Sequence, residues 1–233
     1  MCAERAPAQR QDVYGGRNPA EIPAYTIPEA AHWLQVPYTT TRAWLLGQHG
    51  FAPVVEIADR ETRTLSFQNL VELHVLAAIR RKHGVSLQRV RTAVEFMEQR
   101  LGVPHPLRSH QMLTDGQDLL VEWGGQYLSL NRQGHGEMRA ILEVYLSRIE
   151  LEGEIPARLY PFSRREHLDD PRAILIDPRV QFGRPCVAGT GIPTAVIADR
   201  WRAGESIDGL ADDYGRRREE IEETIRYEIP VAA

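Results

Sequence analysis

The sequence has little cysteine, a single lysine and no long apolar run. Its two cysteines, Cys2 and Cys186, lie far apart, which argues against a disulfide framework and predicts a reducing, cytoplasmic compartment. No apolar run approaches the roughly 18 residues that a membrane span needs, so we expect no membrane partner. Residues 1–24 lack the apolar stretch of a secretory signal, and their composition predicts a flexible arm.

Sequence signatures of catalysis and metal binding are also missing. The eight histidines are isolated, with no H-x-x-x-H pair, and the cysteines form no C-x-x-C pair, so no metal site is predicted. Neither a nucleophile elbow nor a Walker motif occurs. Asp169 and Asp170 are adjacent and would point apart in an extended chain, so we interpret them as a solvated linker and not as an acid–base pair. The sequence therefore predicts no enzyme and no cofactor.

Charge is distributed unevenly along the chain. Residues 1–110 contain 13 basic and 10 acidic residues, a net charge of +3, whereas residues 111–233 contain 15 basic and 22 acidic residues, a net charge of −7. Between residues 60 and 108 there are nine basic residues and four acidic ones. This pattern favours a polyanionic partner for the front half, although an ordinary solvated helix surface has the same composition.

Residues 25–51 predict two short helices joined by a tight turn. Thr26 or Ile27 precedes Pro28, a residue favoured at the first position of a helix, and Pro37 ends that helix. One of three consecutive threonines, 39 to 41, is expected to cap the second helix, which runs to Gly47 with Trp44 turned inward. This is the helix-turn-helix pattern. Two β-prone runs within residues 53–67 then predict a hairpin in the position of a wing.

A DNA-recognition helix presents short polar and basic groups near its N-terminus. The sequence offers four such residues on the second helix and two arginines on the predicted wing: Thr39, Thr40, Thr41, Arg42, Arg60 and Arg63. Contacts from these groups to phosphates would be salt-sensitive. A helical hairpin without a role in DNA binding remains the alternative.

Further elements follow from periodicity and turn residues. We predict helices over residues 66–83, 86–101 and 137–151, strand-and-turn structure over 111–135, a possible strand at 157–163, a charged linker at 163–172 and a strand at 173–179. Three helices are predicted at 194–204, 206–215 and 217–229, the second of them capped by Ser206 and stopped by Gly215. In the last, Ile221, Ile225 and Ile229 share one face.

The segment "FGRPCVAGTGIPT", residues 182–194, concentrates glycine and proline. Gly189 and Gly191 form only a G-x-G, with no third glycine and no lysine after it, so a phosphate loop is weakly indicated. Cys186 has no partner cysteine, which favours a small buried thiol. Pro193 is placed to begin a helix.

Residues 25–101 resemble the winged helix of the MerR family of transcription regulators. The resemblance puts Thr41, Arg42 and Trp44 on the recognition helix and Arg63 on the wing. Ala43 stands where the family usually has an aromatic residue that contacts phosphate. The resemblance implies a homodimer on a near-palindromic operator.

Residues 175–229 resemble a small domain long catalogued as of unknown function and found in VapB-type antitoxins. The pattern G-R-P-x-V-x-G-T-R-I-P is present except that Gly191 replaces its last arginine. The resemblance implies a PIN-like ribonuclease toxin as partner. Three consecutive arginines are candidates for reaching acidic groups of such a toxin, and a solvated cap before an acidic helix is the alternative for them: Arg216, Arg217 and Arg218.

Together these features predict an α+β, mainly helical protein: an arm at 1–24, a MerR-like winged helix-turn-helix at 25–104, a central strand-and-helix segment at 105–165 and a C-terminal strand plus three-helix domain at 166–233. The predicted function is that of a type II antitoxin of the VapB type, which neutralises a VapC-type ribonuclease and represses its own operon. Two alternatives remain open: a MerR-like regulator whose residues 111–165 sense a small ligand, and a partner-binding module with no DNA role.

Overall fold

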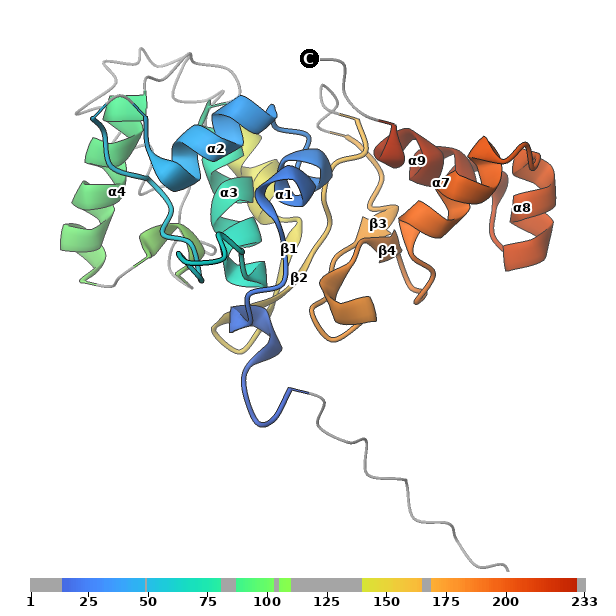
Figure 1. Cartoon of the computed structure of the whole chain (residues 1–233), viewed down its shortest axis with the longest axis horizontal. Helices are drawn as coiled ribbons and strands as arrows, with labels where there is room; N and C mark the ends of the chain where they lie inside the picture. Colours follow the sequence, from blue (N-terminus) through green and yellow to red (C-terminus); the bar gives the residue numbers. More distant parts are fainter. Residues whose placement is uncertain are drawn as a thin grey trace, which may run out of the picture.

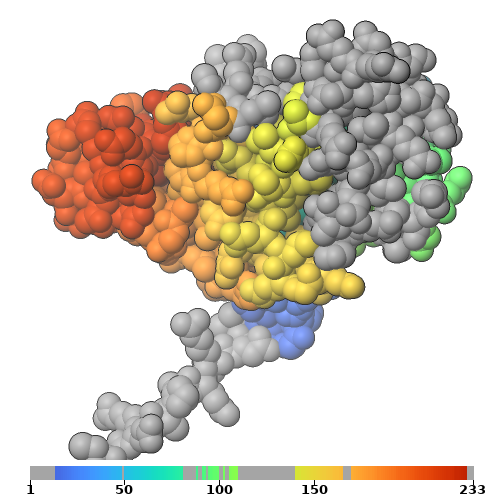
Figure 2. All heavy atoms as spheres, turned by 180° about the vertical axis from the view of Figure 1, so that it is seen from behind, coloured from blue at the N-terminus to red at the C-terminus, as the bar shows by residue number. Residues whose placement is uncertain are grey.

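The structure is a computed structural model that describes residues 14–48, 50–80, 87–102, 105–109, 140–164 and 169–229. These residues contain helices and two small antiparallel sheets. This content confirms the predicted α+β class. The N-terminal helices lie at one end of an elongated molecule and the C-terminal helices at the other (Figure 1). Seen from behind, residues 140–164 lie in the middle and adjoin residues 169–190 (Figure 2).

The N-terminal part consists of short helices around one core. Their bounds are η1 Pro19–Glu21, α1 Ile27–Trp33, α2 Tyr38–Leu46, α3 Phe67–Arg80, α4 Leu87–Leu101 and η2 Pro106–Arg108. Helix α1 begins one residue before the predicted Pro28, and Thr26 caps it in a capping box, in which Glu29 Oε2 accepts from Thr26 N at 2.8 Å and Thr26 Oγ1 accepts from Glu29 N at 3.4 Å. Ala20 of η1 is already buried, so ordered packing begins within the segment expected to be a flexible arm.

The predicted threonine cap of α2 is wrong, because the helix begins earlier. Pro37 is the N-cap, and its carbonyl accepts the backbone N–H groups of Thr40 and Thr41, both at 3.0 Å. Thr39, Thr40 and Thr41 therefore lie inside the first turn. Pro37 supplies no side-chain cap.

The hairpin predicted within residues 53–67 is reduced to a turn closed by one bridge, between Asp59 and Thr64. Helix α3 provides the physical reason. Asn69 Nδ2 donates to Glu56 O at 2.8 Å, and Asn69 Oδ1 accepts from Ala58 N at 3.0 Å. A helix side chain thus takes the backbone groups that a second strand would have paired.

The helix predicted through residue 151 ends at residue 146. Strand β1, Ile149–Glu152, follows and pairs with β2, Ile155–Leu159, so the predicted helical position of Ile149 is wrong. Arg148 provides the reason. Its buried guanidinium donates to the carbonyls of Tyr160 and Pro161, and these hydrogen bonds hold the residue before β1 beside the residues that follow β2. The strand predicted at 157–163 is confirmed in part by β2. The strand-and-turn prediction for residues 111–135 lies outside the described residues.

The charged linker predicted at 163–172 is not solvated at Asp170. This carboxylate is 5% exposed and accepts hydrogen bonds from Ser163, from its backbone N–H at 2.5 Å and from its hydroxyl at 2.9 Å. The Ser163 hydroxyl also lies 2.6 Å from Glu223 of the last helix. Periodicity gave no sign of this contact, because the partners are 60 residues apart in sequence.

The C-terminal part begins with a two-stranded sheet. Strand β3, Ile174–Leu175, pairs with β4, Cys186–Val187, around the short helix η4, Gln181–Gly183. Helices α7 Thr194–Arg202, α8 Ile207–Tyr214 and α9 Arg218–Glu228 follow. Ser206 caps α8 by accepting Gly209 N at 3.1 Å, and Gly215 ends it in the left-handed conformation, as predicted. A small core of its own joins these helices to β4: Val187, Ile197, Leu210, Ala211, Ile221 and Ile225.

The end of α9 joins the N-terminal core. Tyr227 is fully buried there, whereas Ile229, expected on the buried face, is 47% exposed. Beside Tyr227, His32 Nε2 of α1 lies 3.3 Å from Glu228 Oε2. The last helix therefore contacts the first one, and the two halves of the chain pack directly on each other.

Candidate nucleic-acid interface

Helix α2 presents one polar face to solvent and buries the other. Thr39 and Arg42 are exposed, and Trp44 and Leu45 are each 2% exposed in the core. Thr41 is 1% exposed, and its hydroxyl donates to Pro37 O at 3.3 Å. Of the residues predicted on this helix, Thr41 is thus occupied in holding the first turn, while its neighbours remain accessible.

The turn at residues 59–64 carries the two arginines predicted on the wing. The Asp59 carboxylate accepts the backbone N–H groups of Glu61 at 2.9 Å and Thr62 at 3.2 Å, and hydrogen bonds from Thr62 hold the pKa of Asp59 below its usual range. Arg63 is exposed, at a left-handed φ of 55°. Arg60 is exposed as well, but its guanidinium pairs with Glu56 at 2.5 Å.

A polar cavity of about 350 Å³ lies against the exposed face of α2. Its lining residues come from α2, from the residue after its C-terminal glycine and from the end of α3: Thr39, Thr40, Ala43, Trp44, Gln48 and Arg80. The Arg80 guanidinium lies 5.7 Å from the centre of the Trp44 ring. In the sequence, Arg80 is only one of the basic residues between positions 60 and 108, because nothing in the spacing indicates that the end of α3 meets α2.

The three arginines predicted to contact a toxin are paired within the chain. Arg216 lies 2.6 Å from Glu220, Arg217 lies 3.6 Å from the same carboxylate, and Arg218 pairs with Asp208 and Glu222. These contacts join the start of α9 to its own first turns and to α8. The geometry is that of a charged cap before an acidic helix.

The glycine-rich segment is a packed turn. Cys186 is 1% exposed, and burial raises the pKa of its thiol to about 11, which is the unreactive buried thiol predicted. Gly183 has a φ of +76°, and a Cβ placed on it would lie 1.8 Å from the Tyr25 hydroxyl. This glycine lets the C-terminal part approach the residue that precedes α1 by two positions.

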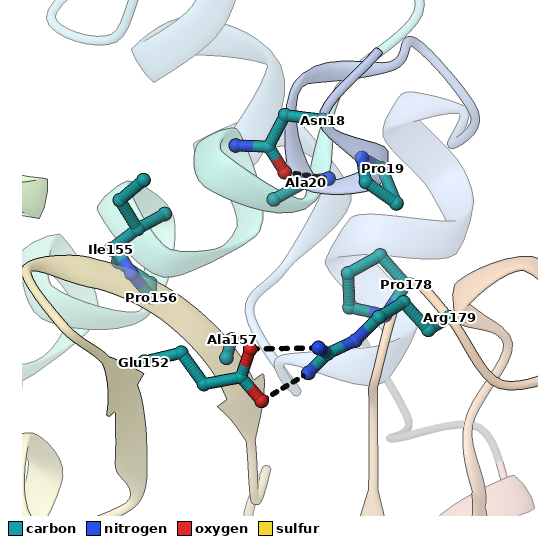
Figure 3. Close-up of a pocket in the computed structure, with 9 residues that line it drawn as sticks. All are labelled: Asn18, Pro19, Ala20, Glu152, Ile155, Pro156, Ala157, Pro178 and Arg179. Carbon is teal, nitrogen blue, oxygen red and sulfur yellow. Dashed lines mark hydrogen bonds and ion pairs between the residues drawn. The ribbon is translucent and has the colours of Figure 1, made fainter. Parts of the chain in front are cut away.

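A second cavity, of about 210 Å³, lies between η1, the β1–β2 hairpin and the turn after β3. Three prolines and Ile155 supply much of its wall (Figure 3). Glu152 and Arg179 close one side through two hydrogen bonds of 2.7 Å, drawn in Figure 3, and these bonds lower the pKa of Glu152. The pair connects β1 to the C-terminal part.

The described residues contain neither a metal-binding cluster nor a membrane-spanning helix. No group of three or more histidine, cysteine or acidic side chains in that part of the chain is arranged to hold a metal ion. No helix in it is long and apolar enough to cross a membrane.

Comparison with known proteins gives a family model and relatives. Residues 174–227 match the family model described as "Protein of unknown function (DUF433)", so the C-terminal domain predicted from its motif is present. The chain is 28% identical over 229 residues to a Mycobacterium tuberculosis protein named "Putative antitoxin VapB45", with 88% of this chain and 93% of that protein covered. It is 23% identical to "Uncharacterized protein Rv2308" of the same organism, covering 87% of this chain and 89% of that one.

A solved structure has a similar fold. The crystal structure of Rv2018 from Mycobacterium tuberculosis superposes with a TM-score of 0.67 at 25% identity and covers 88% of this chain and 98% of that chain. The similarity therefore extends over both halves of the molecule and not over the C-terminal domain alone.

Proposed function

We propose that this protein is the antitoxin of a type II toxin–antitoxin pair, which neutralises a VapC-type, PIN-like ribonuclease and represses its own operon as a homodimer. The observation that carries the proposal is the similarity to a protein named as an antitoxin over 88% of this chain and 93% of that protein. A shared C-terminal domain alone would be compatible with many partners, whereas near-complete coverage favours a shared task.

The N-terminal part is the proposed operator-binding surface, a winged helix of the MerR type. Thr39 and Arg42 on α2 are exposed, and Arg63 projects from the turn that stands where a wing would be. No ion pair or hydrogen bond of the side chain is recorded for Arg42 or Arg63 within the described residues, so both charges are available to phosphates. Arg60 would first have to leave Glu56.

The C-terminal part is the proposed toxin-binding surface. Most of the excess negative charge lies in the half of the chain that contains it, and its arginines 216 to 218 are already paired. Arg217 keeps 77% of its side chain exposed, so it is the one best able to exchange its partner for an acidic group of a toxin. Val196 and Trp201 of α7 are apolar groups exposed on the same domain and would contribute contact area.

Co-expression with the neighbouring reading frame tests the antitoxin role. The neighbour alone should arrest growth, and the full chain should restore growth and co-purify with it in a stable complex. Normal growth of cells that make the neighbour alone would refute the antitoxin proposal. A chain that still binds its upstream DNA in that case would support the ligand-responsive regulator instead.

Operator binding is tested with the double variant Arg42→Ala/Arg63→Ala and a duplex from the region upstream of the gene. Each phosphate contact contributes about −0.9 to the slope of log affinity against log salt, so the double variant should bind more weakly and lose about 1.8 of that slope. Arg202→Ala is the control, because this exposed arginine of α7 pairs with Asp199 at 2.8 Å. Unchanged binding by the double variant would overturn the assigned surface.

A further inference from the structure

The cavity beside α2 combines several hydrogen-bond donors with a cation that has no ionic partner among the described residues. Arg80 is the last residue of α3, and no ion pair or hydrogen bond of its guanidinium is recorded among the described residues. Most arginines of the C-terminal part have carboxylate partners, as Arg200 does with Glu205 and Asp213. A guanidinium has five donors in a planar fork, which suits the oxygens of a phosphate.

Partial burial makes it costly for the Arg80 guanidinium to have no ionic partner among the described residues. The side chain is only partly exposed, and desolvation lowers the pKa of Arg80 because the charged form has lost water. Its contact with the face of Trp44 compensates in part, through a cation–π interaction. An anionic ligand would compensate further.

Trp44 adds a second donor without an acceptor. The residue lines the cavity and is 2% exposed, and its indole N–H is covered from solvent with no hydrogen-bond partner in the described part of the chain. Buried donors of this kind are rare in folded proteins. Arg80 and Trp44 thus line one cavity, and among the described residues neither the guanidinium nor the indole N–H has an acceptor.

The start of α2 supplies further donors on the same wall. Thr39 and Thr40 line the cavity from the first turn of a nine-residue helix, and no side chain caps this helix. The Thr40 and Thr41 N–H groups already donate to Pro37 O, so it is the positive end of the helix dipole, together with the two threonine hydroxyls, that favours an anion there. Gln48 lines the cavity from the opposite end of the helix.

We propose that this cavity binds a phosphate group, with Arg80 as the cation that contacts it, Thr39 and Thr40 as hydroxyl donors, and Trp44 as the aromatic surface that positions the guanidinium. Resting on the proposed function, we assign this phosphate to the DNA backbone beside α2. The site then adds a third arginine, Arg80 at the end of α3, to the operator surface that includes Arg42 of α2.

Binding of two labelled duplexes of equal length, one from the upstream region and one unrelated, measures the contribution of Arg80. Arg80→Ala should weaken both by a similar factor, roughly ten- to a hundredfold for the loss of a charged hydrogen bond, and lower the salt slope by about 0.9. Arg80→Lys, which keeps the charge but loses the fork, should recover part of the affinity. Arg202→Ala is the matched control, since it too replaces an arginine at the last position of a helix. Melting curves identify any variant that is unfolded.

The indole N–H signal of Trp44 in a ¹⁵N–¹H spectrum, assigned with Trp44→Phe, reports on the cavity directly. Duplex should shift this signal in the wild type and leave it in place in Arg80→Ala. If inorganic phosphate shifts it and neither duplex binds, the phosphate site stands with a free phosphate as its source, and operator binding is refuted. If duplex binds to the wild type without moving the Trp44 signal, and Arg80→Ala keeps the wild-type affinity, the phosphate site is refuted and operator binding stands. A signal that neither probe moves also refutes the site.

Discussion

Lowering the pH from 7 to 5 should weaken the fold through His74. This residue of α3 is 2% exposed and packs against the rings of Tyr145 and Phe162, with centroids 4.8 and 6.0 Å away. Its Nε2 lies 3.0 Å from Tyr145 O, so the neutral ring donates to that carbonyl. Burial lowers the pKa of His74 from 6.5 to about 4, and the nearby charge of Arg148 acts in the same direction.

The sign of the effect follows from the direction of this shift. Between pH 6.5 and about 4 the unfolded chain binds a proton at His74 that the folded chain does not, so the free energy of unfolding falls as the pH falls. With these two pKa values the loss between pH 7 and pH 5 is about 2 kcal/mol, and it approaches about 3 kcal/mol below pH 4. The ring is fully enclosed, so solvent screening does not reduce this figure much.

Another histidine acts in the opposite direction but in a different pH range. His105 Nδ1 lies 3.2 Å from the buried Glu72, and the hydrogen bond raises the pKa of His105. Its contribution is complete below pH 6.5 and is lost as the pH rises through the folded pKa. The two effects therefore separate, with His74 responsible for the decline on the acid side.

Urea unfolding of the wild type and of His74→Gln at pH 7, 6 and 5 measures the effect. Glutamine keeps an N–H for Tyr145 O but does not titrate, so the variant should lose the decline of about 2 kcal/mol whatever its absolute stability. Carboxylates with lowered pKa values, such as Glu223, contribute only at lower pH. A variant with the same pH dependence as the wild type would refute the assignment to His74.

Two further predictions concern the contact between the halves of the chain. The Tyr227 hydroxyl is buried with no hydrogen-bond partner in the described residues, so Tyr227→Phe should leave the unfolding free energy unchanged or raise it by about 1 kcal/mol. Tyr227→Ala should lower it by about 3–5 kcal/mol. A large loss of stability in the phenylalanine variant would show that the hydroxyl does have a hydrogen-bond partner. Gly183→Ala should cost roughly 1–2 kcal/mol for its positive φ and roughly 1–3 more for the overlap with Tyr25. Gly189→Ala, with a φ of +73° and open space around it, should show only the first cost, and equal losses in thermal melts would contradict this account.

Local signals were enough to predict much of the fold. The cap of α8 at Ser206 and its stop at Gly215 are predictable, and the start of α1 is predictable to within one residue, because each cap is decided by residues within one turn. The three C-terminal helices were placed correctly for the same reason. Periodicity and capping residues carry this information without reference to the rest of the chain.

The errors arise where a distant side chain decides the local structure. Asn69 takes backbone groups that a hairpin would have used, and Arg148, which precedes β1, binds the carbonyls of Tyr160 and Pro161 that follow β2. Tyr227 replaces Ile229 in the core because the end of α9 meets α1, and the chain alone does not show that contact. Asp170 is buried through partners in two other segments.

The candidate interface was predictable in position but not in detail. The sequence placed polar and basic residues on α2, and the structure exposes Arg42 while it buries Thr41. Whether an arginine is available depends on its neighbours in space: Arg60 is paired with Glu56, whereas Arg80 has no ionic partner in the part of the chain that the structure describes. A count of charged residues does not distinguish these two arginines.

The junction between the two halves consists of buried polar groups as well as apolar ones. The single Ser163 hydroxyl proton lies between oxygens of Asp170 and Glu223, and Arg164 and Arg226 flank Glu223 on its outer side. Burial alone would raise the pKa of Glu223, but hydrogen bonds from Arg164 and Ser163 lower it to about 2, so the carboxylate stays charged at neutral pH.

Buried charges of this kind add little net stability, but they penalise every arrangement in which a partner is missing. An apolar contact tolerates sliding, whereas Glu223 remains satisfied only while Ser163, Arg164 and Arg226 all keep their positions. We therefore expect the C-terminal helices to hold one fixed orientation on the N-terminal part above about pH 4.5, where the unfolded carboxylate is also ionised. In the proposed function, a toxin bound to the C-terminal domain would then have a defined position relative to α2, and a change that displaces α9 would act on α1 through the contact between Glu228 and His32.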